Sequence, residues 1–230
     1  MMLINPFPFV ASSSTATQIL LPLNYTSGFS DIKNNHTITV IDDPVINAGD
    51  GYGFSKFGNG ALFAKGNLSS LRIESTPTLD LSGKKPFTIE CWAFPNPYYG
   101  GSAIFSMRTA SGYCPISLLY TSARIGNSTL TAWNTLSIGT ANETWLHYAV
   151  VGDGTNITVY VDGIAKGQVS HPDWPAGDGF LNIGHDPDAN SWCYFNDVRV
   201  SSGLPTQAIL HLLLHRSLCS YYDDLIIHRN

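Results

Sequence analysis

Residues 144–167 read TWLHYAVVGDGTNITVYVDGIAKG, and this stretch decides the class of fold. Two runs in which apolar and polar residues alternate flank the segment 152–156, whose glycine, aspartate and asparagine residues tolerate positive φ. Asp162 and Gly163 mark a second tight turn. The stretch therefore predicts an antiparallel β-hairpin followed closely by another turn.

Residues 87–94, FTIECWAF, predict a strand with two apolar faces. One face carries Phe87, Ile89, Cys91 and Ala93, and the other carries Thr88, Glu90, Trp92 and Phe94. Because both faces are largely apolar, this strand is expected inside a sandwich. Trp92 and Trp145 lie within predicted strands, so both are assigned to the core.

Further strand-like segments follow the same pattern along the chain. They are residues 18–25, 36–41, 60–64, 70–75, 102–108, 115–121, 134–139, 180–186 and 193–200. Gly, Pro, Asn and Asp interrupt them every 8 to 12 residues, as is typical of antiparallel sandwiches. The expected fold class is all-β, a sandwich of ten or more strands.

Composition narrows the classes of function. The chain has 230 residues, which suits a single all-β domain, and 13% of them are charged. The net charge is −5, without the basic stripe that nucleic-acid binding needs. No apolar run approaches the roughly 20 residues that span a bilayer, and no signal peptide is recognised. We therefore expect neither a nucleic-acid partner nor a membrane span.

Carboxylates that could catalyse hydrolysis are sparse. The three glutamates, Glu74, Glu90 and Glu143, lie in different segments. A glycosidase needs two carboxylates flanking the scissile bond, and the usual alternate acidic residues on one strand are missing. His147 is expected to be a core histidine rather than a base, because no nucleophile with a matching acid accompanies it. No catalytic residue is assigned, and the protein is expected not to be an enzyme.

Several short motifs occur in an order typical of a known family. They are SKFGNGALF (55–63), FTIECW (87–92), ETWLHYAV (143–150), ITVYVDG (157–163), LNIG (181–184) and FNDVRVSSG (195–203). Together they resemble the concanavalin A-like lectin/glucanase superfamily, most closely the laminin G-like domain of the phage and bacterial type. The resemblance covers roughly residues 20–203. It implies a jelly roll of two curved antiparallel sheets.

The resemblance also suggests a function. It implies a non-enzymatic, lectin-like module on a phage virion surface, in a tail, fibre or capsid-associated protein that binds host-surface glycans. The alternatives are a purely structural virion protein, and less favourably a glycan hydrolase. Neighbouring virion proteins would bind an N-terminal arm, residues 1–17, and the module could form a homo-oligomer.

Two departures from the family pattern stand out. Cys193 replaces the usual glycine, and Asn196 replaces the acid that usually precedes Asp197. After the sandwich, residues 18–203, the tail 204–230 is unlike the extended Thr- and Pro-rich segment of relatives. One hypothesis is that the tail is read in a shifted frame; the other is an apolar helix that packs on the sandwich or a neighbouring subunit.

Loop aromatics are the candidates for sugar binding, because flat rings stack on the C–H faces of pyranoses. The candidates are Tyr98, Tyr99, Trp174 and Trp192.

Asp186, Asp188 and Asn190 stand at alternate positions, which lets oxygen ligands converge on a hard cation such as Ca²⁺. The alternative is a polar turn built on Asx hydrogen bonds. No cofactor is required, and Cys91 and Cys193 are expected to be buried, reduced thiols.

Overall fold

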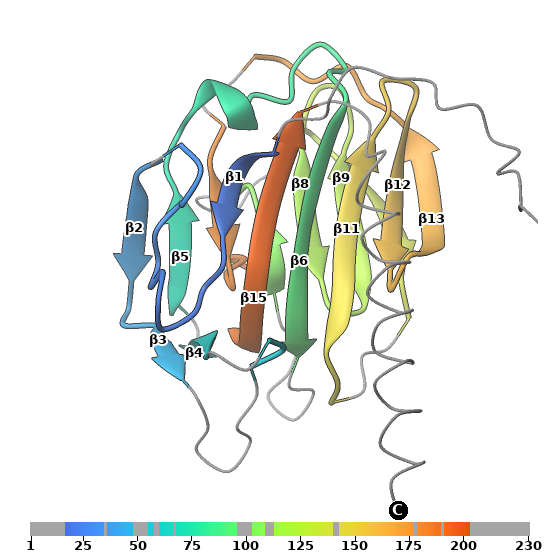
Figure 1. Cartoon of the computed structure of the whole chain (residues 1–230). Helices are drawn as coiled ribbons and strands as arrows, with labels where there is room; N and C mark the ends of the chain where they lie inside the picture. The colour runs from blue at the N-terminus through green and yellow to red at the C-terminus, as the bar shows by residue number, and fades with distance from the viewer. Residues whose placement is uncertain are drawn as a thin grey trace, which may run out of the picture.

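Two antiparallel sheets packed face to face form the molecule (Figure 1). The computed structural model describes residues 17–34, 36–47, 55–57, 60–66, 68–95, 103–108, 113–139, 143–176, 179–189 and 191–202. The predicted all-β sandwich is confirmed. The predicted arm, apart from Thr17, and the tail 204–230 lie outside the described residues. Among the described residues, no helix has the length and apolar character needed to span a membrane.

Among the described residues, the first sheet has eight strands. In order they are β13 (Ile164–Ser170), β12 (Asn156–Val161), β11 (Leu146–Gly152), β6 (Phe87–Pro95), β15 (Ser191–Ser202), β4 (Ala61–Gly66) and β3 (Val45–Asn47), with β1 (Thr17–Leu21) also paired to β15. The second sheet has seven strands in the part of the chain that the structure describes. In order they are β10 (Trp133–Ser137), β9 (Ser122–Gly126), β8 (Ile116–Leu119), β7 (Ala103–Ser106), β14 (Leu181–Ile183), β5 (Ser70–Ile73) and β2 (Ile38–Ile41). A short 3-10 helix, η1 (Pro77–Leu79), follows β5.

The predicted hairpin is confirmed as β11 and β12, with Gly152 opposite Ile157. Asp153 closes the turn, because its Oδ1 accepts hydrogen bonds from the backbone N–H groups of Thr155 and Asn156 at 2.7 and 2.6 Å. Gly154 supplies the positive φ of 88° that the turn requires.

Strand β6 lies near the centre of the first sheet, between β11 and β15. Its predicted inner face is confirmed: Phe87, Ile89, Cys91 and Ala93 all belong to the core between the sheets. This core mixes side chains from both sheets, and it includes Phe105, Ile116 and Ile125 from the second sheet. The outer face of β6 points away from it.

The buried thiols agree with the expectation from the sequence. Cys91, Cys114 and Cys193 are free and buried. Burial raises the pKa of Cys114 to about 12, so this thiol stays protonated at neutral pH.

Candidate functional site

The four aromatic residues predicted to bind sugar have different outcomes. Tyr98 and Tyr99 lie outside the described residues. Trp192 is half-buried on β15, where it alternates with the core residue Cys193 and therefore faces outward. Trp174 is buried in the core.

The prediction that Trp174 is an exposed stacking platform is wrong. Its side chain is only 2% exposed, and its Nε1–H donates to the carbonyl of Gly126 at 2.9 Å. The ring packs against Phe87 and His171, with centroid separations of 6.4 and 5.3 Å. A large ring whose single polar group is satisfied internally is stable in a core, and here it holds the loop 171–176 against the sandwich.

Asp186, predicted to bind a cation, instead binds a buried arginine. Its Oδ1 accepts from Nη1 of Arg108 at 3.0 Å, and its Oδ2 accepts from the hydroxyl of Ser117 at 2.7 Å. Asp186 is 1% exposed and Arg108 5% exposed. The guanidinium thus supplies the positive charge that a buried carboxylate needs.

Asp188 is held in the same way. Its Oδ2 lies 2.6 Å from Nη1 of Arg108 and 3.0 Å from Nη1 of Arg124. The hydrogen bond from Arg108 lowers the pKa of Asp188. Asn190 lies outside the described residues, and among those described no cluster of three His, Cys, Asp or Glu could hold a metal. The backbone N–H of Asp188 also donates to Oδ1 of Asp186 at 2.9 Å, which is the Asx hydrogen bond of the alternative interpretation. In the described part of the chain both carboxylates thus belong to a polar turn paired with arginine, and calcium binding stays a prediction.

A row of aromatic rings crosses the outer face of the first sheet near the end of β6 that carries Pro95. Its members are Trp145, Phe94, Tyr194, Phe63 and Trp192, which we call the aromatic band. Phe94 pairs with Tyr194, and Tyr194 pairs with Phe63, across β6, β15 and β4. The sequence analysis missed this band.

The rings of the aromatic band touch one another in sequence. Tyr194 stacks on Phe63 with centroids 4.5 Å apart and planes 18° from parallel. Phe94 meets Trp145 edge-on at 6.0 Å, and Phe63 meets Trp192 at 6.1 Å. Phe94 and Tyr194 are buried, whereas Phe63, Trp145 and Trp192 are half-buried. The inner rings therefore support the outer ones, which remain in reach of a ligand.

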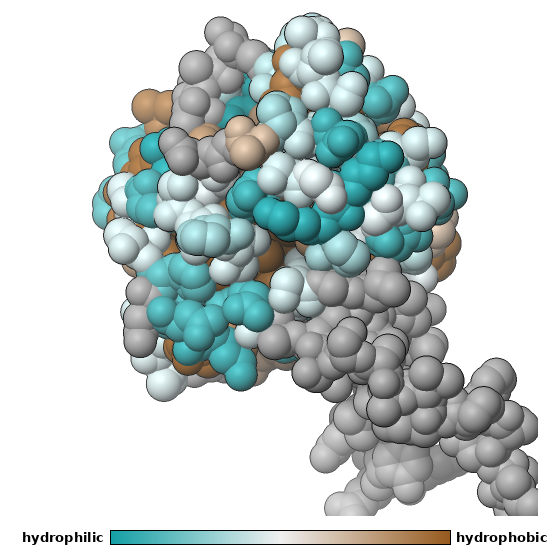
Figure 2. All heavy atoms as spheres, turned by 90° about the horizontal axis from the view of Figure 1, so that it is seen from above, coloured by the Kyte–Doolittle hydropathy of each residue, from teal (hydrophilic) through white to brown (hydrophobic). Residues whose placement is uncertain are grey.

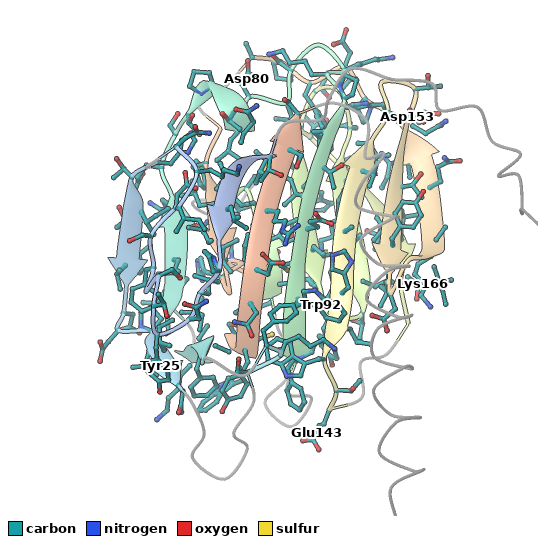
Figure 3. The ribbon with its side chains drawn as sticks, in the orientation of Figure 1. Tyr25, Asp80, Trp92, Glu143, Asp153 and Lys166 are labelled. Atoms are coloured by element: carbon teal, nitrogen blue, oxygen red, sulfur yellow. The ribbon has the colours of Figure 1, made fainter. Side chains whose placement is uncertain are left out.

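Trp92 stands half-buried on the same outer face of β6 (Figure 3), so its assignment to the core between the sheets is wrong. Trp145 is also half-buried, and it packs against the smaller cluster that contains Phe94 and Tyr194. The ammonium group of Lys56 lies 4.2 Å from the centroid of the Trp92 ring. Phe57 packs edge-on against that ring at 6.2 Å and is 47% exposed. This group extends the aromatic surface toward the middle of the sheet.

Below Trp92, the outer face carries a buried acid–base pair. Glu90 Oε2 lies 3.2 Å from Nε2 of His147, whose ring lies 5.3 Å from that of Trp92. Glu90 and His147 are 8% and 6% exposed. His147 is thus buried as expected, but on the outer face and not in the core between the sheets. On the neighbouring strand, Asp197 is paired with Arg199 at 2.6 Å. These carboxylates are thus engaged by bases rather than facing each other across a substrate cleft.

Asn196 explains one departure from the family pattern. Its Nδ2 donates to the carbonyls of Leu23 and Gly60 at 3.1 and 3.0 Å, and approaches that of Pro22 at 3.3 Å. Its Oδ1 accepts from the backbone N–H of Lys56 at 3.0 Å. A carboxylate could not donate to these carbonyls. The amide therefore fixes the segment that places Lys56 over Trp92.

A separate hollow lies at the other end of the sandwich, and we call it the end cavity. Its volume is about 210 Å³, and its walls include Leu79, Met107, Tyr113, Trp174 and Phe180. Figure 2 looks onto this end, where hydrophobic atoms show between hydrophilic patches. Asp80, which also lines the cavity, lies at the same end as Asp153 in Figure 3. Trp174 and Pro175, in the loop 171–176, form part of the wall of this cavity.

The chain matches the model of a known family. A family model described as concanavalin A-like lectin/glucanases superfamily matches residues 48–208, which is more than half of the chain. No curated protein sequence matches the chain significantly.

Several toxin binding domains have a similar structure. The binding domain of Paraclostridial Mosquitocidal Protein 1 has a TM-score of 0.62 at 13% identity, covering 85% of this chain and 51% of that one. The ligand binding domain of botulinum neurotoxin serotype D, solved with N-acetylneuraminic acid, has a TM-score of 0.61 at 10% identity, covering 86% and 50%. Botulinum neurotoxin type C, which depends on two ganglioside molecules to enter cells, has a TM-score of 0.61 at 14% identity, covering 88% and 51%. The chain spans about half the length of these domains, and the likeness concerns the fold.

Proposed function

The chain belongs to the concanavalin A-like lectin/glucanases superfamily, and from this premise we propose that it is a non-enzymatic glycan-binding module. The single observation that carries the proposal is the aromatic band on the outer face of the first sheet, together with Trp92. Half-buried rings held by buried ones form a rigid, amphipathic surface. Such a surface stacks on pyranose rings with little loss of side-chain entropy.

The arrangement of charges supports binding rather than cleavage. Glu90 is paired with His147 and Asp197 with Arg199. Glycoside hydrolysis needs one carboxyl group free to donate a proton and another free to attack or activate water. The paired carboxylates of this face do not offer that division of roles.

The relatives by structure lend support of a general kind. Domains of the same fold belong to toxins that bind N-acetylneuraminic acid or gangliosides. Because this chain covers only half of each domain, the likeness does not locate the sugar site on it. Our placement of the site rests on the aromatic band. It replaces the platform around Trp174, and it retains Trp192 from the residues predicted by sequence.

We further propose that the module is displayed on a virion surface, where it would bind glycans of a host envelope. The support is the resemblance of its motifs to the phage and bacterial form of the laminin G-like domain. A binding assay on whole bacterial envelopes, compared with a glycan array, tests this setting. Binding to isolated glycans without binding to any envelope would contradict it.

Paired variants test the proposed surface. Trp192→Ala and Trp92→Ala should each weaken glycan binding about tenfold or more, because stacked aromatic residues dominate such contacts. Tyr113→Ala is the matched control: this tyrosine is 45% exposed but lines the end cavity. Binding to a glycan array is measured for the three variants, and thermal melts show that each one folds. The comparison decides whether the aromatic surface or the end cavity binds the glycan. Loss of binding in Tyr113→Ala alone would assign the function to the end cavity.

A further inference from the structure

Two lysines on the outer face bear on what kind of sugar the proposed site takes. Lys56 Nζ lies 4.2 Å from the centroid of Trp92, and Lys65 Nζ lies 5.9 Å from that of Trp192. Resting on the proposed function, we infer that the ligand is an acidic oligosaccharide whose carboxylates are bound by Lys56 and Lys65 while its rings pack against the two tryptophans.

The two lysines differ from other charges around them. Neither forms an ion pair with a carboxylate of the described residues, although both lie in a chain with a net charge of −5. The neighbouring carboxylates Glu90 and Asp197 are already engaged by His147 and Arg199. Among the described residues, Lys56 and Lys65 are therefore left without a paired carboxylate, and a ligand carboxylate could balance their charge.

Each lysine and its tryptophan form a combined contact. An ammonium group over an indole ring is held by a cation–π interaction and keeps donor hydrogens for another partner. A sugar that packs against the tryptophan beside the lysine would bring its carboxylate close to the ammonium group. A neutral sugar would gain the packing but not the charge-assisted hydrogen bond.

The spacing of the two contacts favours an oligosaccharide over a single sugar. Lys65 pairs with Trp192 across β4 and β15, and Trp92 pairs with Asn196, four residues further along β15. At about 3.3 Å per residue, the two tryptophans stand roughly 13 Å apart along the strand direction. A chain of sugars with carboxylates on separate residues spans this distance.

The test uses pairs of sugars that differ in charge. Binding of the full-length chain is measured by titration calorimetry with oligogalacturonate and its methyl ester, and with disialyllactose and lactose. We expect the acidic member of at least one pair to bind about tenfold more tightly at low salt. This preference should shrink as NaCl is added, because salt screens exposed charges. The pair that shows the preference tells whether the carboxylates belong to a uronic acid backbone or to linked sialic acids.

Variants assign the preference to the two lysines. The double variant Lys56→Gln/Lys65→Gln should lose the preference for the acidic sugar and keep its affinity for the neutral one. Lys166→Gln on β13, an exposed lysine of the same sheet, is the matched control and should behave as the unmodified protein. Thermal melts of each variant show that the fold is retained.

Each negative result bears either on the inference or on the proposed function. Equal binding of the acidic and neutral members in both pairs would overturn the inference and leave the proposed function standing. An acidic preference that survives in the double variant would also overturn it. Absence of binding to all four sugars and to a glycan array would overturn the proposed function, and the inference with it.

Discussion

Asp31 shows how one buried carboxylate organises the chain after the first strand. It is 2% exposed. Its Oδ1 accepts from the backbone N–H groups of Leu20 and Lys33 at 3.0 Å, and its Oδ2 lies 2.6 Å from Nδ1 of His36. Burial disfavours the charged form, but the hydrogen bonds from Leu20, His36 and Lys33 outweigh it and lower the pKa of Asp31 to about 2.

A pH dependence of stability follows from Asp31. Because its folded pKa of about 2 lies below the ordinary value of 3.8, its contribution is complete above pH 4 and is lost as the pH falls toward 2. Asp31→Asn should lose about 2 kcal/mol of unfolding free energy at neutral pH and flatten the curve in this acid range. Urea unfolding between pH 2 and 7 measures both effects. The exposed Asp43→Asn is the control, and an equal loss in both variants would contradict the role of burial.

Arg108 gives a second prediction at the scale of single residues. Its removal leaves Asp186 buried without a counter-charge, so Arg108→Ala should lose about 3 kcal/mol or more of unfolding free energy. Because arginine already neutralises Asp186 and Asp188, neither calcium nor a chelator should change the melting temperature of the unmodified protein. Calorimetry with calcium and with EDTA checks this, and a rise in melting temperature on adding calcium would restore the predicted cation site.

These residue contacts mark a limit of what the sequence could tell. The alternate acids of 186–190 were visible as a motif. Their partner Arg108 lies 78 residues from Asp186 in the chain, and only the pairing of β7 with β14 brings the two segments together. The amide of Asn196 likewise bonds carbonyls more than 130 residues away. Such partners depend on strand order, which local patterns do not encode.

At the scale of elements, the alternation in β6 predicted one face correctly. Phe87, Ile89, Cys91 and Ala93 are core residues as expected. The other face was also assigned to the core, because an apolar pattern cannot distinguish a second buried layer from an outer face covered by aromatic rings. Trp92 was therefore misassigned. Trp174, in contrast, does lie in a loop. The proline and aspartate residues around it suggested an exposed side chain, but its ring is buried.

Stability and binding should accordingly separate between the two tryptophans. Trp174→Ala removes a ring that is 2% exposed and its hydrogen bond to Gly126, so it should lose about 3 to 5 kcal/mol of unfolding free energy. Trp92→Ala removes a half-buried outer ring and should lose about 1 to 2 kcal/mol, while weakening glycan binding. Urea denaturation of both variants gives the order. A larger loss for Trp92→Ala would return this residue to the core.

For the whole molecule, the sequence predicted a sandwich with many strands but not how they pair. The hairpin β11–β12 was local and visible. The pairing of β1 with β15, which places Thr17 opposite Ser201, joins segments from opposite ends of the described chain. Neither the turn signals nor the alternation could reveal it, because strand order in a jelly roll is set by the packing of the complete core.

This pairing predicts how the chain tolerates truncation. A fragment of residues 17–202 retains every described strand and should melt cooperatively, close to the full chain. A fragment of residues 23–202 lacks β1, whose Ile19 and Leu21 are fully buried, and should lose at least about 3 kcal/mol of unfolding free energy. Circular dichroism melts of the two fragments test this. Equal stability would show that β1 is dispensable.

The pairing of β6 with β15 also determines where the aromatic band lies relative to the two ends of the described chain. Ser202 lies opposite Phe87, at the first residue of β6, and Cys193 lies opposite Pro95, at its last. Thr17 and Ser202, the first and last described residues, therefore lie at one end of the sandwich. Trp192 and Phe94 lie near the other end, roughly 26 Å away at about 3.3 Å per residue. A protein attached to the domain through the chain next to Thr17 or Ser202 would hold it at the end opposite the aromatic band. The aromatic band would then face away from the attached protein. Copies attached side by side would all present this band in the same direction.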